Sequence, residues 1–375
     1  MDLRPTWMEV YLDNLRYNYR LLKQWFAEND APESRVFAVL KADAYGLGAI
    51  PVAWALKQEG ADFFILATAD EALEFRKAGI TDTLLVLGAS SLNCAEPYVR
   101  HGIRASISDL EMARALSREA VRQERSAWLH IAVDTGMGRI GFSPEEAPER
   151  IAEISRLPGV VCEGIFTHFS TADESDMEYT ERQHECFLDV IRRTEALGIR
   201  IPLPHCCNSG ATVRYPGWGM AGGRPGHLLV GLYPSPDTPR LLSLRAGFSL
   251  KTRVSLIKRL EAGKDVGYGR TYTTSSSETI AVLPIGYVDG YDRRFSNNGE
   301  VLIRGRRCPI VGRICMDQCM VRVDGLDEVE VGDEVVLLGR QGEEEISVYE
   351  YAERIGVIVT QVGPMITARV PRVYI

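Results

Sequence analysis

The sequence predicts an α/β fold followed by a β-rich part, and three observations carry this prediction. Eight apolar, β-branched runs recur over roughly 230 residues with helical segments between them, which favours a (β/α)8 barrel of the TIM type. Most of these runs are apolar on both faces, as buried parallel strands must be. Short strands with turn glycines then replace this alternation, which indicates a second, barrel-like β domain. A doubly wound open sheet is the alternative for the first part.

Each predicted strand of the barrel is a short apolar run followed by a helical pattern. The eight strands are expected at residues 36–40, 63–67, 84–87, 103–107, 128–133, 161–167, 201–206 and 228–233. The helices expected between them include residues 50–59, 70–78 and 109–119. Three S/T-x-x-E capping signals mark helix starts, at residues 68–71, 108–111 and 143–146. Pro144 would then be the first helical residue of its helix.

The second domain is predicted from a change of pattern after residue 233. Residues 233–239 carry three prolines and look like a linker. Short strands are expected beyond them at residues 280–283, 301–303, 310–311, 320–323 and 335–338, with one helix at residues 348–354.

Length, composition and charge narrow the class of protein. A chain of 375 residues is long enough for two domains and a large core. Its apolar and charged fractions, 45% and 25%, are those of ordinary globular proteins. A net charge of −8 argues against a nucleic-acid partner, because phosphate binding needs a basic surface. No run of about 20 apolar residues predicts a membrane span. The first residues also lack the apolar core of a signal peptide, so we expect a cytoplasmic location.

The eight cysteines lack the spacing of a metal site. Close groupings occur at Cys206 with Cys207 and at Cys315 with Cys319, and neither has the second pair of a zinc ribbon. We therefore expect free thiols in a reducing compartment, and no bound metal.

Lys41 is the sharpest single indication of chemistry. It follows five apolar residues, at the carboxyl end of the first predicted barrel strand, which is where active sites of such barrels lie. A lysine at an apolar mouth loses solvation, which lowers its pKa and frees the neutral amine to act as a nucleophile. Taken alone, the position favours a lysine that extends to solvent or pairs with a carboxylate.

Further polar groups fall at the same rim of the predicted barrel. They are residues 134–139 after the fifth strand, His168 after the sixth, residues 205–209 after the seventh, and Arg224 before the eighth. Asn208, Ser209 and the backbone of Gly226 can offer donors to a phosphate near a helix start, although each also fits an ordinary cap or turn.

Two features of the second domain are also unusual. Tyr268 stands between two glycines, which suits either a turn residue or an acid/base group presented to another surface. Met316 and Asp317 place a carboxylate in a strand pattern, where Asp is rare.

Residues 39–48, with the sequence VLKADAYGLG, are similar to the pyridoxal-phosphate lysine motif of the alanine racemases. Eight further segments resemble that family in the same order along the chain: residues 67–79, 133–142, 163–169, 205–209, 266–272, 285–291, 309–318 and 369–374. The resemblance covers essentially the whole chain. It implies a pyridoxal-phosphate-binding barrel over residues 12–243 and a β domain over residues 244–375, which the strand within residues 1–11 joins.

The resemblance also implies how the site is assembled. Two subunits would form a head-to-tail homodimer, in which the barrel of one and the β domain of the other complete each active site. The substrate would be a small amino acid, and the expected reaction is the interconversion of L- and D-alanine.

Family resemblance further implies the roles of single residues. Lys41 would hold pyridoxal phosphate covalently and serve one face of the substrate, while Tyr268 from the other subunit would serve the opposite face. Arg224 would face the pyridine nitrogen, and because an arginine keeps its proton, that nitrogen would stay unprotonated. His168 would link Arg224 to Tyr268. The remaining expected contacts are Tyr45, Asn208, Ser209 and Gly226 around the phosphate, Arg139 at the phenolic oxygen and the substrate, and Tyr287, Met316 and Asp317 at the substrate entrance.

Three positions depart from the family pattern. Ala132 stands where the family usually has a lysine, often carbamylated, so Arg139 would lack a negative partner. Val230 replaces a tyrosine. Thr360 aligns with a tyrosine that touches the phosphate and the substrate side chain, so we expect a larger pocket and relaxed or altered specificity, toward serine for example.

Two rival functions stay open on the sequence. One is a pyridoxal-phosphate decarboxylase or aldolase on a related barrel, against which Tyr268 and Arg224 argue. The other is a cofactor-binding homologue without catalysis, to which Ala132 and Thr360 give some weight.

Overall fold

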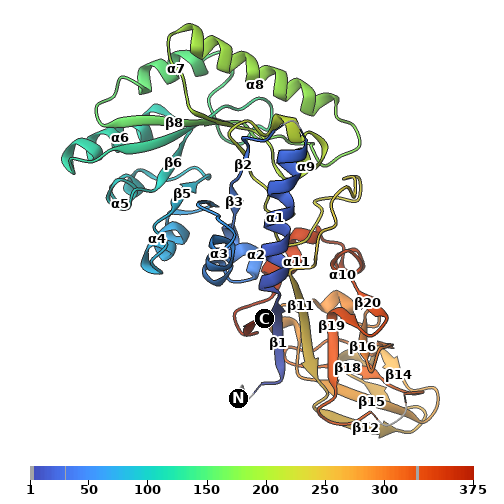
Figure 1. Cartoon of the computed structure of the whole chain (residues 1–375). Helices are drawn as coiled ribbons and strands as arrows, with labels where there is room; N and C mark the ends of the chain where they lie inside the picture. The colour runs from blue at the N-terminus through green and yellow to red at the C-terminus, as the bar shows by residue number, and fades with distance from the viewer. Residues whose placement is uncertain (1–3, 30, 327–328) are drawn as a thin grey trace. The chain divides into compact units, whose positions relative to one another are not determined.

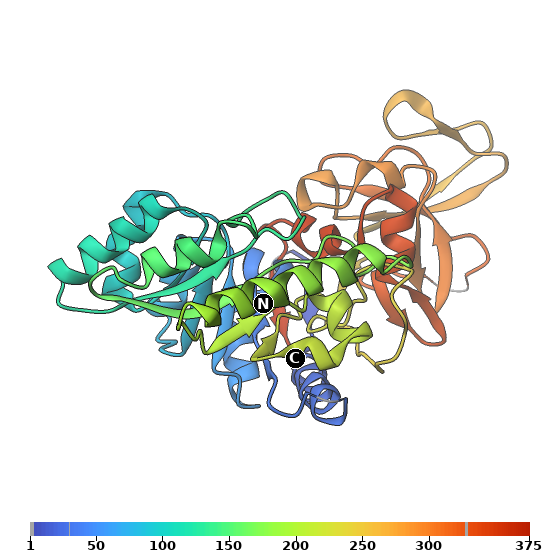
Figure 2. The same cartoon turned by 90° about the horizontal axis from the view of Figure 1, so that it is seen from above.

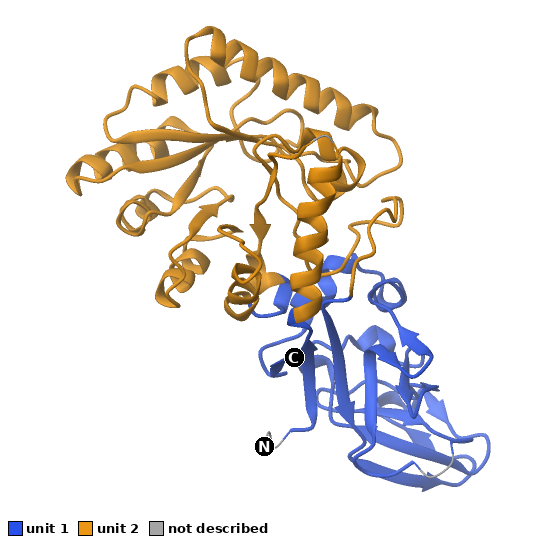
Figure 3. Ribbon diagram, viewed as in Figure 1, with its two compact units in different colours: residues 1–12, 45–48, 246–375 blue, residues 13–44, 49–245 orange. Residues whose placement is uncertain are grey.

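The computed structural model describes residues 4–29, 31–326 and 329–375. The chain divides into two compact units (Figure 3). One, here called the barrel unit, holds residues 13–44 and 49–245. The other, the β unit, holds residues 45–48 and 246–375 together with the amino-terminal segment that ends at residue 12.

The barrel unit alternates parallel strands with helices (Figure 1). Its strands are β2 (Arg35–Val36), β3 (Ala38–Val39), β4 (Phe63–Leu66), β5 (Thr83–Val86), β6 (Arg104–Ile107), β7 (Ala127–Ala132), β8 (Val160–Phe166), β9 (Leu203–His205) and β10 (Gly222–Gly223). Its helices are α1 (Leu12–Glu28), α2 (Lys41–Gly46), which continues into the β unit, α3 (Ala49–Lys57), α4 (Ala69–Lys77), α5 (Ala95–His101), α6 (Leu110–Arg122), α7 (Ala147–Ile154), α8 (Glu178–Ala196) and α9 (Ser209–Arg214), with 3-10 turns at Leu92–Cys94 and Pro216–Gly219. Strands β3 to β9 pair with their neighbours in chain order, which confirms the predicted barrel class.

The eighth strand does not lie where the sequence predicted it. Residues 228–233 form a buried turn, and the position is taken by β10, which pairs in parallel with β2. The N–H groups of Ala221 and Arg224 donate to β9 and the following residues at 3.0 and 2.8 Å, so β10 bridges the ring. A Cβ at Gly222 would meet the Phe37 ring at 2.7 Å, which explains a strand made of glycines. The prediction was wrong because a short buried apolar segment shows the same hydrophobic pattern whether it forms a strand or another buried structure.

The helix α2 is left-handed. Four consecutive non-glycine residues, 42 to 45, have φ between 52° and 57°. This conformation costs roughly 1–2 kcal/mol per residue, and such strain persists only where the surroundings hold it. Glu71 accepts the N–H of Ala42 at 2.7 Å, and Asp43 accepts the N–H of Ala49 at 2.6 Å.

The predicted caps are partly confirmed. Thr68 and Glu71 form the reciprocal capping box at the start of α4. Ser143 and Glu146 exchange hydrogen bonds as expected, but α7 begins only at residue 147. The cap of α6 is Asp109 and not residue 108, because the Asp109 carboxylate reaches the N–H of residue 112 at 2.8 Å.

The β unit is built from short, mostly antiparallel strands. They are β1 (Thr6–Val10), β11 (Phe248–Arg253), β12 (Leu256–Leu260), β13 (Asp265–Val266), β14 (Tyr272–Thr273), β15 (Glu278–Leu283), β16 (Glu300–Ile303), β17 (Arg306–Pro309), β18 (Cys319–Arg322), β19 (Glu334–Gln341), β20 (Glu344–Ile346) and β21 (Arg372–Tyr374). The main sheet has the order β17-β16-β19-β11-β1-β21, and β12-β15-β18 forms a second sheet. Two helices, α10 (Val348–Ile355) and α11 (Val359–Met365), complete it with 3-10 turns at Tyr268–Arg270, Tyr287–Asp289 and Arg293–Phe295.

Two predictions for this part of the chain were wrong. Residues 310–311 form no strand of their own, and Ile310 makes only an isolated bridge to Val321. The proline-rich segment 233–239 is not a linker, because it packs within the barrel unit: the Tyr233 hydroxyl donates to the carbonyl of Leu242 at 2.6 Å, and Thr238 is buried.

The outer surface of the barrel unit carries α8, the longest of the described helices at 19 residues (Figure 2). Within the described ranges, no helix is both long and apolar enough to cross a membrane.

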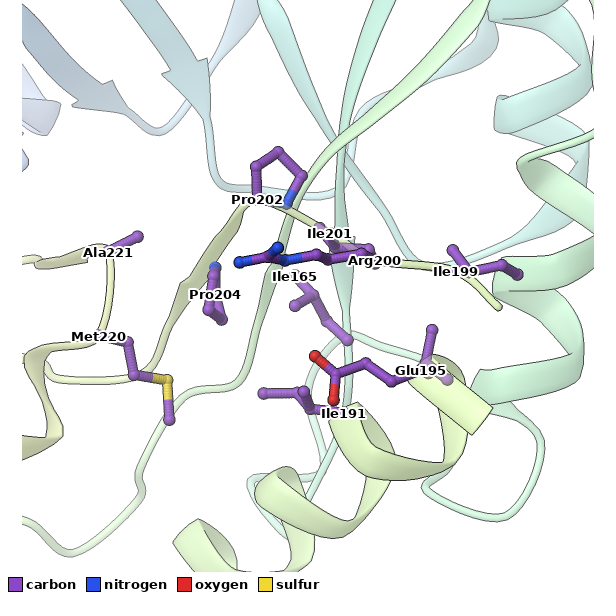
Figure 4. Close-up of a pocket in the computed structure, with 11 residues that line it drawn as sticks. Ile165, Ile191, Glu195, Ile199, Arg200, Ile201, Pro202, Pro204, Met220 and Ala221 are labelled. Carbon is purple, nitrogen blue, oxygen red and sulfur yellow. The ribbon is translucent and has the colours of Figure 1, made fainter. Parts of the chain in front are cut away.

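A pocket of about 260 Å³ opens at the amino ends of β9 and β10, away from Lys41 (Figure 4). Its walls are mostly apolar, and the side chains of Arg200 and Glu195 also line it.

Candidate active site

Lys41 follows β3 at its carboxyl end and is the first residue of α2. Its side chain is exposed in part to solvent. Protein atoms nevertheless surround the amine, and this burial, followed by the positive charge of Arg139, lowers the pKa of Lys41 below its ordinary value. The amine is therefore closer to its neutral, nucleophilic form than a surface lysine is.

Arg224 is buried at the same end of the barrel, 4% exposed. Its Nη2 donates to the carbonyls of Thr167 and Cys206 at 2.8 and 2.9 Å, and lies 3.3 Å from Nδ1 of His168. Burial lowers the pKa of Arg224 to about 10, so the guanidinium stays charged at neutral pH. Its Nε is also buried, and no described residue accepts a hydrogen bond from it.

His168 is held neutral. Burial, and then the charge of Arg224, lower the pKa of His168 well below its ordinary value. The expected link from His168 to Arg224 is present in the barrel unit. Tyr268 belongs to the other unit, so the second half of the predicted link stays a prediction.

Arg139 lies on a loop that one carboxylate organises. Asp134 accepts the N–H groups of Gly136, Gly138 and Arg139 at 3.0, 2.9 and 3.1 Å. The Arg139 side chain is exposed, and no described carboxylate forms an ion pair with it. Ala132, at the end of β7, is buried and offers no charge.

The predicted phosphate ligands of the barrel unit lie around α9. Asn208 caps this helix by accepting the N–H of Ala211 at 3.0 Å, so its side chain already has a structural task. Ser209 accepts the N–H of Gly226 at 3.1 Å, which brings these two predicted ligands together and leaves the serine proton available to a ligand.

A buried chain of side chains extends from Arg224 into the barrel interior; the sequence placed His205 among the polar rim groups but did not single out His130 or Glu163. Nη1 of Arg224 lies 2.9 Å from Nδ1 of His205, whose Nε2 lies 2.9 Å from Nδ1 of His130. Nε2 of His130 lies 3.2 Å from the carboxylate of Glu163, which pairs with Arg104 at 3.0 Å. Single buried histidines in apolar strands look like core residues, and only the adjacency to Arg224 distinguishes these.

The β unit gathers four predicted residues around one pocket of about 940 Å³. They are Tyr268, Tyr287, Met316 and Asp317. Tyr268 is 69% exposed, and the flanking glycines both have φ of 73°, a turn that projects the ring outward. Asp317 pairs with Arg369 at 2.5 Å. The unit therefore presents two tyrosines, a thioether and an anchored carboxylate on one face.

Tyr45 and Thr360 occur together in the β unit but outside that pocket. Thr360 is half-buried on α11, and the same helix packs against the turn that carries Tyr45. A Cβ at Gly363 would lie 2.3 Å from the carbonyl oxygen of Tyr45, and one at Gly46 would lie 2.5 Å from the carbonyl oxygen of Gly363. Burial raises the pKa of Tyr45 far above its ordinary value, so its phenol stays protonated.

Comparisons with known proteins agree with this arrangement. Residues 10–234 match the family model "Alanine racemase, N-terminal domain", and residues 247–374 match "Alanine racemase, C-terminal domain". The alanine racemase of Symbiobacterium thermophilum is 46% identical over 377 aligned residues, covering 100% of this chain and 99% of the relative. Among solved structures, the alanine racemase of Clostridium difficile 630 matches with a TM-score of 0.95 at 39% identity, covering 100% of this chain and 97% of that one. The histidine racemase of Leuconostoc mesenteroides matches with a TM-score of 0.90 at 28% identity, covering 100% and 99%.

Proposed function

The chain belongs to the alanine racemase family, and from this premise we propose that it is a pyridoxal-phosphate-dependent isomerase that interconverts L- and D-alanine. Family membership over both units supports the reaction. The buried Nε–H of Arg224, which has no acceptor among the described residues, carries the assignment of the cofactor.

The residues present fit pyridoxal phosphate. A buried N–H without a partner is costly, and the pyridine nitrogen is an acceptor that would satisfy the Nε–H of Arg224. Because the pKa of Lys41 is lowered, its amine is suited to a covalent bond with the aldehyde of pyridoxal phosphate. Ser209, the backbone of Gly226 and Tyr45 would hold the phosphate, with Asn208 fixing the start of α9. Arg139 would contact the phenolic oxygen.

The chain's own groups then move the proton. When bound, the cofactor withdraws electrons from the substrate and acidifies its Cα hydrogen. On one face the neutral amine of Lys41 takes that proton while the phenol of Tyr268 from a second copy gives one on the other face; in the reverse direction the phenolate of Tyr268 takes the proton and the ammonium of Lys41 gives one. Arg224 stays protonated beside the ring nitrogen, because its pKa of about 10 is far above neutral pH. Arg224 would therefore donate to the ring nitrogen of a bound cofactor without protonating it, which would limit side reactions.

Two copies of the chain are needed in this proposal. Tyr268, Tyr287, Met316 and Asp317 lie together and largely exposed on the β unit, where a second copy could use them. We infer a homodimer in which each β unit supplies these residues to the other copy's barrel. Tyr287, Met316 and Asp317 would then line the substrate entrance.

We expect a substrate range broader than alanine alone. Thr360 in place of the family tyrosine leaves a smaller side chain on α11, beside the turn that carries Tyr45. A hydroxyl or methylene in such a pocket changes discrimination by only about 1–3 kcal/mol, so we expect measurable turnover of serine beside alanine. The histidine racemase neighbour has the same fold. Turnover of an amino-acid panel, followed by chiral chromatography for the wild type and Thr360→Tyr, tests this. Equal discrimination against serine by both proteins would contradict it.

An optical experiment tests the function itself. The protein loaded with pyridoxal phosphate should be yellow, lose its visible band on borohydride treatment and racemise alanine. Lys41→Ala should lose the covalent label and the activity. A visible band that persists in Lys41→Ala, or wild-type protein that releases carbon dioxide instead of the other enantiomer, would overturn the assignment.

A further inference from the structure

We propose that His205, His130 and Glu163 form a one-way hydrogen-bond relay that positions Arg224 as a donor toward the cofactor's pyridine nitrogen. The three are positioning residues, since they act through Arg224. The proposal rests on the proposed function only for the identity of the group that Arg224 faces.

The direction of every hydrogen bond follows from Arg224. A guanidinium can only donate, so Nδ1 of His205 must accept at 2.9 Å. The proton of a neutral His205 ring is then on Nε2, which donates to Nδ1 of His130 at 2.9 Å. His130 in turn carries its proton on Nε2 and donates it to Glu163 at 3.2 Å. Each ring is fixed in one tautomer by its neighbours.

Both ends of the relay are charged and the middle is neutral. Burial lowers the pKa of His130 below its ordinary value and that of His205 well below it, so both rings are neutral near neutral pH and each carries a single N–H. Burial alone would raise the pKa of Glu163, but hydrogen bonds from His130 and Arg104 lower it to about 2. The relay therefore ends on a permanent carboxylate, which favours a proton on the near nitrogen of His130.

The backbone is shaped to make these contacts. In the parallel pairing of β7 with β8, Leu129 lies opposite Cys162, and the next residue, His130, lies opposite Gly164. Glu163 has no opposite residue and is therefore the extra residue of a β-bulge. Bulges re-aim side chains beside active sites, and this one accompanies the contact between Glu163 and His130. A Cβ at position 164 would lie 2.1 Å from Nδ1 of His130, so glycine is required there.

Packing also holds the rings at fixed angles. The His205 ring is stacked on Phe166, with centroids 5.2 Å apart and an interplanar angle of 7°. Both histidines are completely buried. A buried network of this kind is stabilising only if every member is satisfied, so loss of one acceptor disturbs the next donor.

The consequence for Arg224 is a fixed orientation. Its Nη1 donates to His205, and its Nη2 contacts two backbone carbonyls and His168, which leaves Nε as the one nitrogen of Arg224 without a partner among the described residues. If His205 adopted the other tautomer, an N–H would oppose the N–H of Arg224 and push the guanidinium away. A change at Glu163, on the far side of two buried rings, should thus be detected at the cofactor.

Three variants of the loaded protein test the relay. Glu163→Gln keeps an acceptor for His130 but removes the charge, and His130→Phe removes the acceptor for His205. His184→Phe is the matched control, because His184 is also buried in the barrel unit but belongs to the stack with Trp218 at 3.8 Å. For each variant we would measure the visible absorption spectrum of the bound cofactor, kcat and KM for alanine, and the rate of side conversion to pyridoxamine phosphate.

The relay predicts a graded result. His130→Phe should shift the visible band and lower kcat about 10- to 100-fold with little change in KM, which is the range seen when the outer partner of a metal-binding histidine is lost. It should also speed the side conversion. Glu163→Gln should change the same quantities in the same direction but less. His184→Phe should match the wild type in all of them at mildly alkaline pH. Nitrogen NMR of the histidine side chains should report protonated Nε2 in both relay rings of the wild type.

Each contrary outcome is informative. Unshifted spectra and unchanged kcat in both relay variants would overturn the relay while leaving the proposed function intact. So would a relay ring protonated on Nδ1 in the wild type, a measurement that needs no folded variant. Wild-type protein without any visible band would instead refute the proposed function, and the NMR result would still decide the tautomers.

Discussion

Gly363→Ala should weaken cofactor binding through the turn that carries Lys41 and Tyr45. The new Cβ would lie 2.3 Å from the carbonyl oxygen of Tyr45. An ordinary carbon–oxygen contact is about 3.3 Å, so the two backbones must separate by about 1 Å. The left-handed residues 42 to 45 directly follow Lys41 within α2, so we expect this shift to reach both Tyr45 and Lys41. Misplacement by about 1 Å can cost roughly 100-fold in a reaction that depends on alignment.

The assay is an absorbance titration of cofactor-free protein with pyridoxal phosphate, followed by alanine racemisation at saturating cofactor. We expect Kd to rise and kcat to fall, while the free energy of unfolding changes little. Alanine favours the helix by about 1 kcal/mol over glycine, which offsets part of the overpacking. Gly356→Ala is the matched control: its φ of 64° makes alanine strained, but its Cβ would meet no atom within 4 Å. That variant should lose stability and keep cofactor affinity. If Gly363→Ala binds the cofactor within twofold of the wild-type affinity, the contact of α11 with the turn that carries Tyr45 does not control cofactor binding.

Two further predictions concern proton transfer and pH. Tyr268→Phe should slow deuterium uptake from solvent much more from one alanine enantiomer than from the other, because it removes the proposed base on one face; equal losses would exclude a one-face base. Burial lowers the pKa of His184 to about 4, while the unfolded chain takes up that proton near pH 6.5. The stabilisation that depends on a neutral His184 is therefore fully present above about pH 6.5 and is lost as the pH falls toward 4, by up to about 1.4 kcal/mol per pH unit. His184→Phe should flatten this slope in urea unfolding, and an unchanged slope would assign the effect to other groups.

Sequence patterns predicted the architecture well where burial and chemistry coincide. Lys41 was singled out because a charged residue after a buried strand has few explanations, and the structure places it at the barrel mouth with a lowered pKa. The capping box of Thr68 and Glu71 was confirmed because it depends on local contacts alone. It also has a second role that no local pattern encodes, since Glu71 accepts the N–H of Ala42 in the left-handed turn.

Other features could not be predicted because they depend on distant partners. In the sequence, the two glycines of β10 suggest a loop. In the structure, the rings of Phe37 and Phe26 occupy the space that a Cβ at these positions would need. His130 and His205 are 75 residues apart and acquire meaning only when the barrel brings their nitrogens to 2.9 Å. The left-handed turn of residues 42–45 contradicts the local preference of each of its residues, and tertiary contacts decide it.

In the proposed enzyme, each active site needs the barrel unit of one copy and the β unit of another. Subunit mixing tests this most directly. Lys41→Ala and Tyr268→Phe proteins should each be nearly inactive, and random reassociation of the two should restore about a quarter of wild-type activity, since half the dimers would be mixed and each of those holds one intact site. If the reassociated mixture stays as inactive as its parents although mixed dimers form, Lys41 and Tyr268 do not act across two copies.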